Sequence, residues 1–297
     1  MSNILTTTNL TKKFGSLKAV NELNLSIKEG QVFGLLGPNG SGKTTTLGMV
    51  LGVTAVTSGS FSWFDGEQVY ETRKKIGAIL EQPIFYPGYT AVENLKIVAA
   101  IKQIDLSNME HVLRLVNLWE RRHDRFSGYS LGMKQRLAIA SAMLCDPKAL
   151  ILDEPTNGLD PEGIAQIREI IVNIAETGKS IILASHLLDE VQKVCTHFCI
   201  LRRGNLIHQG SVKADMGNEL RVSVDATHRE SLQKAVQEAA MVTEIMEEEG
   251  RLEVSLTADA DIADFSKHLT EQGLVLTHLE VLKKSLEEQF LEIVKNS

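Results

Sequence analysis

The residues best suited to chemistry form one short glycine-rich run near the N-terminus. They match in full the pattern Gly-x-x-x-x-Gly-Lys-Thr of a phosphate-binding loop: Gly37, Pro38, Asn39, Gly40, Ser41, Gly42, Lys43 and Thr44. A strand-like apolar run precedes the motif and a helical run follows it, which is the context that the motif requires. Backbone N–H groups and the helix N-terminus can then converge on phosphate oxygens. We predict that this loop, with Thr45, binds a nucleotide, with Lys43 on its β- and γ-phosphates and Thr44 on Mg²⁺.

A second group of candidate residues ends the apolar run at residues 149–152, where Asp153 and Glu154 follow directly. A buried strand that ends in two acids places carboxylates at the carboxyl edge of a sheet, where ligands bind in α/β proteins. We assign Asp153 to the shell of Mg²⁺ and Glu154 to orient or deprotonate the attacking water. The alternative is a strand that simply ends in two solvent-facing acids.

Further motifs accompany these two and point to one family. Residues 127–136 read Ser-Gly-Tyr-Ser-Leu-Gly-Met-Lys-Gln-Arg, residues 158–160 read Gly-Leu-Asp, and residues 185–186 read Ser-His. Gln82 follows the predicted strand at residues 76–80. In this order the motifs strongly resemble the ATP-binding cassette (ABC) family. The resemblance covers residues 1–215, and the remainder resembles the appendage of some exporter cassettes, including its closing residues 285–290.

The resemblance implies a role for each remaining candidate residue. Phe14 would stack on adenine, with a core phenylalanine as the alternative. Gln82 would sense the γ-phosphate and contact the metal, and His186 would contact the γ-phosphate, although a lone histidine after a strand is usually a packing residue. Ser130 and Gly132 would reach the ATP of a second subunit in a head-to-tail dimer, and Asp160 would lie in the loop that links the two sites.

The signature loop, residues 129–133, departs from the common family form Leu-Ser-Gly-Gly-Gln at Tyr129, Leu131 and Met133. Ser130 still offers a hydroxyl and Gly132 still permits close backbone approach. The form Tyr-Ser-Leu-Gly-Met is typical of exporter cassettes for peptides and antibiotics.

The resemblance implies an ATPase subunit that powers export through separate membrane permease subunits. Two copies would form a homodimer that closes on ATP and opens after hydrolysis, and residues 82–94 would pass the motion to the permease. The alternatives are a translation-associated or chromosome-associated cassette, a GTPase, and a nucleotide-binding regulatory subunit with little hydrolysis. A second cassette, a long coiled coil and an Asn-Lys-x-Asp motif are not found in the sequence, which disfavours the first two alternatives.

Composition limits the partners and the compartment. The formal net charge of -7 argues against nucleic acid and against direct binding to an anionic membrane. Three cysteines are too few for a disulfide framework, and Cys195, His197 and Cys199 fit a buried strand better than a metal site. Residues 1–8 lack a signal-peptide pattern, and the uncharged span 44–64 is broken by Thr, Ser and Gly. We expect no membrane span and a cytoplasmic protein held peripherally at the membrane by its permease.

The elements that must position these residues follow from apolar periodicity. Residues 31–36, 149–152 and 180–185 are continuous apolar runs, so we expect them at the centre of a parallel sheet. Residues 17–27 and 61–80 alternate in polarity and predict antiparallel strands. The fold class predicted for residues 1–215 is therefore an α/β P-loop NTPase cassette with a mixed sheet and a helical signature subdomain.

Residues 216–297 predict a second, small α+β domain. Strands at 219–224, 242–246, 251–256 and 274–279 and helices at 228–238 and 261–271 give the order β-α-β-β-α-β, which is ferredoxin-like. The glutamates at 247–249 are predicted to form a solvated hairpin tip. A capping-box spacing at residues 285–288 predicts a terminal helix, which docks on its own chain or contacts a partner.

Overall fold

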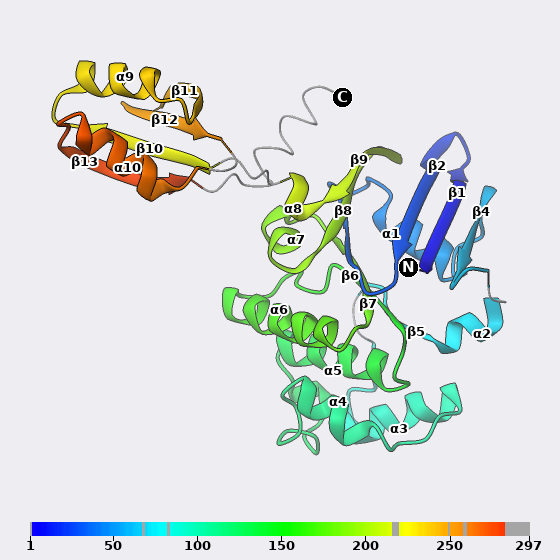
Figure 1. Ribbon diagram of the computed structural model, residues 1–297. Coiled ribbons are helices and arrows are strands. Elements are labelled where there is room, and N and C mark those ends of the chain that lie inside the picture. Colours follow the sequence, from blue (N-terminus) through cyan, green and yellow to red (C-terminus); the bar gives the residue numbers. More distant parts are fainter. Residues whose placement is uncertain are drawn as a thin grey trace. The chain divides into compact units, whose positions relative to one another are not determined.

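The computed structural model describes residues 2–66, 69–81, 84–215, 220–248, 250–257 and 260–282 (Figure 1). The chain forms two compact units that divide between Val212 and Lys213. The first unit contains two sheets and the second contains one, and each unit has its own hydrophobic core. The domain ends predicted from the sequence, 1–215 and 216–297, stay predictions.

A six-stranded sheet forms the centre of the first unit. Its strands in spatial order are β5 (Ile76–Ile79), β6 (Ala149–Asp153), β7 (Ser180–Ser185), β3 (Val32–Leu36), β8 (His197–Arg202) and β9 (Asn205–Ser211). The first five strands are parallel, and β9 pairs antiparallel with β8. Every residue of β3, β6 and β7 is buried, as expected for apolar strands covered on both faces. The predicted centre of the sheet is therefore confirmed.

A smaller antiparallel sheet packs against the same core. It contains β2 (Leu17–Lys28), β1 (Asn3–Phe14) and β4 (Ser58–Trp63) in that order. Leu10, Leu23 and Trp63 from this sheet belong to one buried cluster with Phe33 and Ile151 from the parallel sheet. The predicted mixture of parallel and antiparallel strands is confirmed.

The expectation of antiparallel strands throughout residues 61–80 is wrong in its second half. Helix α2 (Val69–Lys74) follows β4, and β5 then joins the parallel sheet beside β6. The reason is the close packing of β5 under a helix: a Cβ atom on Gly77 would lie 2.3 Å from the carbonyl oxygen of Ala142. Glycine allows this approach, which a pattern of alternating polarity does not reveal.

The helices of the first unit cover the parallel sheet and build a separate helical end. They are α1 (Lys43–Val50), α2, α3 (Ala91–Lys102), α4 (Met109–Leu115), the 3₁₀ turn η1 (Phe126–Gly128), α5 (Leu131–Met143), α6 (Pro161–Glu176) and α7 (Leu188–Val194). Helix α8 (Val212–Asp215) begins at the point where the two units divide. Figure 1 shows α3, α4 and α5 gathered at one end of the unit, and α5 contacts both α3 and α4. A capping box between Thr90 and Glu93 starts α3. The helical signature subdomain is therefore present.

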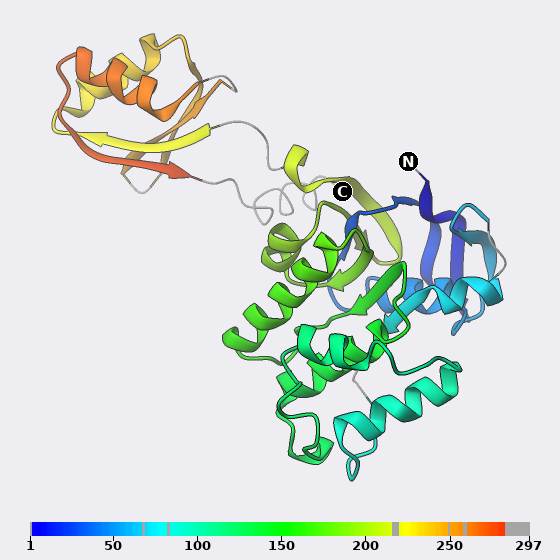
Figure 2. The same cartoon turned by 60° about the horizontal axis from the view of Figure 1, so that its bottom comes forward.

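The second unit is an antiparallel sheet covered on one face by two helices. The strands are β11 (Val242–Glu248), β12 (Arg251–Leu256), β10 (Leu220–Ala226) and β13 (Leu276–Leu282), in that spatial order. Figure 2 shows α9 (Arg229–Glu238) and α10 (Ile262–Glu271) side by side on the same face of this sheet. Phe265 and Leu269 of α10 are fully buried among apolar strand residues. The predicted β-α-β-β-α-β order is confirmed, whereas the predicted terminal helix lies outside the described residues.

No helix within the described ranges is both long enough and apolar enough to cross a bilayer.

Candidate active site

Strand register brings three sequence motifs to one edge of the parallel sheet. Leu36 of β3 pairs with Ser185 of β7, and Asp153 of β6 pairs with Ala184 of the same strand. All three strands are parallel, so the residues that follow them leave the sheet at its carboxyl edge. Gly37, Glu154 and His186 therefore begin the three loops of one site.

The glycine-rich loop runs from β3 into α1 through positions where only glycine fits. Gly42 has φ 109°, and a Cβ atom there would lie 2.5 Å from the carbonyl oxygen of Ala19. A Cβ atom on Gly37 would lie 2.3 Å from the carbonyl oxygen of Leu201. Gly42 is also the N-cap of α1 and has no side chain to satisfy the first N–H groups of the helix. These groups are left available to an anion.

Lys43, the first residue of α1, is folded back over the loop. Its side chain is 5% exposed, and its ammonium donates to the carbonyl oxygens of Gly37 at 2.7 Å and Pro38 at 3.4 Å. The same nitrogen lies 3.1 Å from Oε1 of Glu154. The loop therefore holds one buried positive charge beside the catalytic carboxylate predicted from the sequence.

Glu154 lies between two basic groups. Its backbone has φ 47°, in the left-handed region that non-glycine residues rarely adopt, and this turn ends β6. In a continuing strand, Asp153 and Glu154 would point to opposite faces. Here Oε1 of Glu154 contacts Lys43, and Oε2 lies 2.7 Å from Nδ1 of His186. The structure thus joins Lys43, Glu154 and His186 in one cluster.

Asp153 is the second carboxylate at this edge, and it has an unsatisfied oxygen. Its side chain is 3% exposed and shares a hydrogen bond with Thr44. Burial raises the pKa of Asp153, although the hydrogen bond from Thr44 acts in the opposite direction. Within the described part of the chain, Oδ1 of Asp153 finds no hydrogen-bond partner. Two adjacent oxygen donors and one unsatisfied carboxylate oxygen suit a hard divalent cation.

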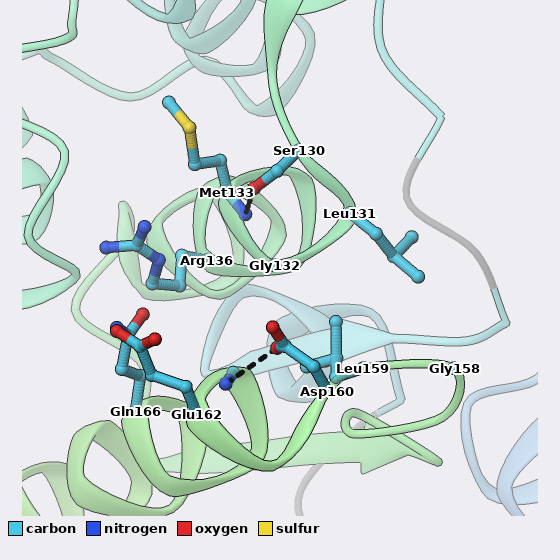
Figure 3. A pocket seen from close by; sticks show the side chains of 11 residues that line it. Ser130, Leu131, Gly132, Met133, Arg136, Gly158, Leu159, Asp160, Glu162 and Gln166 are labelled. Carbon is cyan, nitrogen blue, oxygen red and sulfur yellow. Dashed lines mark hydrogen bonds between the residues drawn. The ribbon is translucent and has the colours of Figure 1, made fainter.

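Two hollows adjoin these residues. One of about 330 Å³ is lined by Thr44, Glu81, Leu131, Gln135, Asp153, Glu154, Asn157 and Gly158. The other, of about 450 Å³, is shown in Figure 3 and is lined mainly by the first turns of α5 and α6. Ser130, Gly132 and Asp160 line this second hollow. The predicted site residues are therefore divided between two places on the same chain.

The second hollow is lined by the first turns of two helices, which Figure 3 shows one above the other. Ser130 is the N-cap of α5, and its hydroxyl oxygen accepts from the N–H of Met133 at 3.2 Å. Asp160 is the N-cap of α6, and its carboxylate accepts from the N–H of Gly163 at 2.9 Å. The positive ends of two helix dipoles therefore lie at one hollow, which is also lined by Arg136 and by the carboxylates of Asp160 and Glu162.

The unusual signature residues have different surroundings. Tyr129 is 4% exposed and donates its hydroxyl hydrogen to the carbonyl oxygen of Arg121 at 2.7 Å. Burial raises the pKa of Tyr129 and keeps the phenol neutral. Leu131 is 44% exposed and lines both hollows. Tyr129 thus anchors the signature loop to the protein, while Leu131 faces solvent.

The remaining predicted residues lie apart from this cluster or outside the described chain. Phe14 ends β1 with its ring 55% exposed and the ammonium of Lys12 4.8 Å from the ring centroid, so the alternative of a core phenylalanine is wrong. Gln82 lies outside the described residues. Cys195 and Cys199 are buried, and burial raises the pKa of both thiols. No group of three or more His, Cys, Asp or Glu side chains that could hold a metal ion occurs in the described ranges.

Sequence reasoning missed one buried contact beside the site. Thr156, two residues beyond Glu154, donates its hydroxyl hydrogen to Oε2 of Glu190 at 2.6 Å. Both side chains are at most 5% exposed. Their sequence positions could have suggested this contact. Thr156 lies between the motif that ends in Glu154 and the motif Gly158-Leu159-Asp160, and Glu190 follows four residues after His186.

Comparisons with known proteins agree with this geometry. Residues 20–157 match the family model for ABC transporters. The bacitracin transport ATP-binding protein BcrA of Enterococcus faecalis is 32% identical over 99% of this chain and 97% of its own length. The lantibiotic transport ATP-binding protein SrtF of Streptococcus pyogenes is 39% identical over 67% of this chain and 87% of its own.

Solved structures give the same result. The ATP-binding cassette MJ0796, solved as a dimer in a post-hydrolysis state bound to ADP and Pi, is 26% identical with a TM-score of 0.62. The match covers 70% of this chain and 99% of that one. Since similarity to BcrA runs through nearly the whole length of both proteins, this chain belongs to the ATP-binding subunits of ABC transporters, which couple hydrolysis of ATP to transport.

Proposed function

We propose that two copies of this chain close head to tail around two ATP molecules, so that each site joins Lys43 of one copy to Ser130 of the other. The observation that carries this proposal is the division of the site residues between two hollows. The cluster of Lys43, Glu154 and His186 lies at the sheet edge, whereas Ser130 and Asp160 line a separate hollow formed by helix N-termini. Each chain therefore supplies two different half-sites, and a second copy completes both.

Within each site, Glu154 acts as the general base for hydrolysis. A triphosphate in the glycine-rich loop competes for the ammonium of Lys43, because phosphate oxygens are strong acceptors for a charged donor. Glu154 is then released from Lys43 and accepts a proton from the attacking water. His186, 2.7 Å from the carboxylate, keeps it aimed at that water and contacts the γ-phosphate. Phe14 offers an exposed ring on which adenine stacks.

Mg²⁺ fits the residues at the start of α1 and the end of β6. Thr44 and Asp153 would hold it together with Gln82, and the unsatisfied Oδ1 atom of Asp153 supports this assignment. When bound, the ion neutralises charge on the β- and γ-phosphates. The raised pKa of Asp153 implies that the empty site takes up a proton more readily than an exposed aspartate does.

The motion reaches membrane permease subunits through the segment that follows the parallel strand β5. In its described part, Ile84 is 94% exposed, Tyr86 59% and Tyr89 47%, which supports a protein partner on this surface. Loss of the γ-phosphate opens the dimer and reverses the motion. The protein would then be cytoplasmic and peripheral on the inner face of the membrane. By analogy with relatives named for bacitracin and lantibiotic transport, we propose export of peptide-type antibiotics.

Light scattering on the variant Glu154→Gln tests the shared site. The amide keeps the shape of the side chain but is not a base, so this variant binds Mg-ATP without turning it over. We expect its molar mass to double in saturating Mg-ATP and to stay that of one chain in Mg-ADP. The double variant Lys43→Ala with Glu154→Gln is the control and should remain a single chain. A Glu154→Gln protein that stays monomeric in Mg-ATP would contradict the head-to-tail model.

A further inference from the structure

The contact between Thr156 and Glu190 joins the same two segments as the catalytic pair. Glu154 and Thr156 belong to the loop between β6 and α6, while His186 and Glu190 belong to the segment that starts α7. Glu154 and His186 lie 2.7 Å apart, and Thr156 and Glu190 lie 2.6 Å apart. The loop is therefore attached to the segment after β7 at two points, one at the site and one directly behind it.

The second point of attachment is buried, and the first is partly open. Thr156 is 4% exposed and Glu190 is 5% exposed, whereas the side chains of Glu154 and His186 are 19% and 36% exposed. A hydrogen bond shielded from water resists competition by solvent and fixes the position of its partners more firmly. The buried pair can therefore define the loop position when substrate and water exchange at the exposed pair.

Glu190 is not explained by packing alone. Its Oε1 atom has no hydrogen-bond partner among the residues that the structure describes, and a buried carboxyl group with an unsatisfied oxygen destabilises the fold. Burial raises the pKa of Glu190, which is the expected response of a carboxyl group held away from water. The hydrogen bond from Thr156 and the charge of Arg168 act in the opposite direction and lower this pKa. What Glu190 adds is an acceptor for the hydroxyl of Thr156.

The loop needs such an anchor because its backbone is bent sharply at Glu154. The N–H of Glu154 donates to the carbonyl oxygen of Ala184 at 3.0 Å, and the residue then adopts φ 47°. The N–H of Asn157 donates back to the carbonyl oxygen of Glu154 at 3.1 Å. This left-handed turn sets the direction of the carboxylate. Thr156 is the next polar side chain of the loop, and its bond to α7 holds the turn in place.

We propose that Glu190 is a positioning residue for ATP hydrolysis: through Thr156 it holds the loop that aims Glu154 at the site of water attack. The proposal rests on the role of Glu154 as general base. Glu190 does not touch the reacting atoms, and nucleotide binding by the glycine-rich loop does not depend on it. Loss of the contact should therefore reduce kcat and leave the KM for ATP nearly unchanged.

Steady-state phosphate release by the full chain tests this with pairs of variants. Thr156→Val removes the hydroxyl and Glu190→Ala removes the acceptor, and each should lower kcat by roughly 10- to 100-fold, the effect of a small misplacement of a catalytic group. Thr156→Ser and Glu190→Gln keep the hydrogen bond and should retain kcat within about twofold. The double variant Thr156→Val with Glu190→Ala should be no slower than the slower single variant, because both remove the same contact.

Thr7→Val is the control for loss of a buried threonine hydroxyl away from the site. The Thr7 hydroxyl donates to the carbonyl oxygen of Leu23 at 2.9 Å and accepts from the N–H of Leu25 at 2.8 Å, in the antiparallel sheet. Thr7→Val should keep wild-type kcat. A wild-type kcat for Thr156→Val would overturn the proposal. So would a double variant in which the fold-reductions in kcat of the two single variants multiply. If Glu190→Ala does not fold, the comparison of Thr156→Val with Thr156→Ser still decides. Glu154→Gln is assayed alongside: if it hydrolyses ATP normally, the role of Glu154 fails instead.

Discussion

At the residue scale, the carboxylate that we propose as the general base lies between two basic groups. Glu154 contacts Lys43 at 3.1 Å and His186 at 2.7 Å, and in the proposed mechanism the contact with His186 persists after the triphosphate takes over Lys43. Preorganised charges of this kind need little rearrangement during the reaction, which is why they lower the barrier effectively. The buried Thr156–Glu190 contact extends the same preorganisation one layer further from the substrate.

Glu190→Gln should change the pH dependence of stability. Burial raises the pKa of Glu190 above its ordinary value of 4.5, so the folded state binds this proton more tightly than the unfolded state does. The stabilisation is therefore full in acid and is lost as the pH rises through the raised pKa. Glutamine has no such proton. We expect urea unfolding to show Glu190→Gln more stable than wild type at pH 8, with a smaller difference at pH 5. A difference that grows toward acid would contradict this.

Some of these residues were predictable from the sequence and others were not. Lys43, Thr44, Asp153 and Glu154 lie within short contiguous motifs, so local spacing identifies them. The Thr156–Glu190 contact is different, since it depends on the register of β6 against β7, which residue patterns do not specify. The surroundings of Tyr129 could not be predicted from the sequence either. Its position suggested a nucleotide-facing loop, whereas its hydroxyl donates to the carbonyl oxygen of Arg121.

At the element scale, the half-site that we propose for the second copy lies at two helix N-termini. Ser130 caps α5 and Asp160 caps α6, and each cap satisfies one N–H group of its helix. Pro161 follows Asp160 at the first position of α6, where its missing N–H has no consequence. Further amides of the first turns remain for phosphate oxygens. In the proposed dimer, the residues that cap these helices would therefore also lie at the nucleotide.

The variant Ser130→Asp separates these two roles. Aspartate caps helices as well as serine does, so the melting temperature should stay within a few degrees of wild type. A carboxylate facing a triphosphate repels it, so ATP-driven dimerisation of this variant in the Glu154→Gln background should be lost. Ser130→Thr keeps both the cap and the hydroxyl and should still dimerise. Light scattering distinguishes the two variants. Dimerisation of Ser130→Asp at the usual ATP concentration would remove Ser130 from the site.

Strands could be predicted from the sequence where the pattern of apolar residues is regular. Continuous apolar runs identified β3, β6 and β7. Alternation of polar and apolar residues identified the strands of the second unit. Residues 61–80 were misjudged because β5 is only four residues long and contains Gly77, which packs against α5. A strand this short takes its direction from its neighbours in the sheet, and its own sequence does not encode that choice.

At the scale of the whole molecule, each of the two units has a hydrophobic core among its described residues. The core of the first unit joins its parallel and antiparallel sheets, while the core of the second unit is built from β10, β12 and the two helices. Every residue that we assign to nucleotide binding belongs to the first unit. The second unit therefore need not be intact for nucleotide to bind.

Scanning calorimetry of the full chain should reveal this division as two unfolding transitions. Mg-ATP at about 100 times its Kd stabilises only the unit that binds it, by roughly 2.7 kcal/mol. For a unit of this size that corresponds to a rise in Tm of about 5–10 °C. We expect one transition to move and the other to stay in place. Equal shifts of both transitions, or no shift of either, would contradict the assignment of nucleotide binding to the first unit alone.

The central claim is that Lys43 grips the nucleotide and Glu154 activates water, and phosphate release from Mg-ATP tests it most directly. Lys179 is a matched control, because its ammonium lies 2.6 Å from Asp146 and 3.0 Å from the carbonyl oxygen of Pro147, before β7 and β6 begin. We predict that Lys43→Ala and Glu154→Gln lower turnover at least about 100-fold, whereas Lys179→Ala keeps the wild-type rate. Wild-type turnover by Lys43→Ala or by Glu154→Gln would contradict the account.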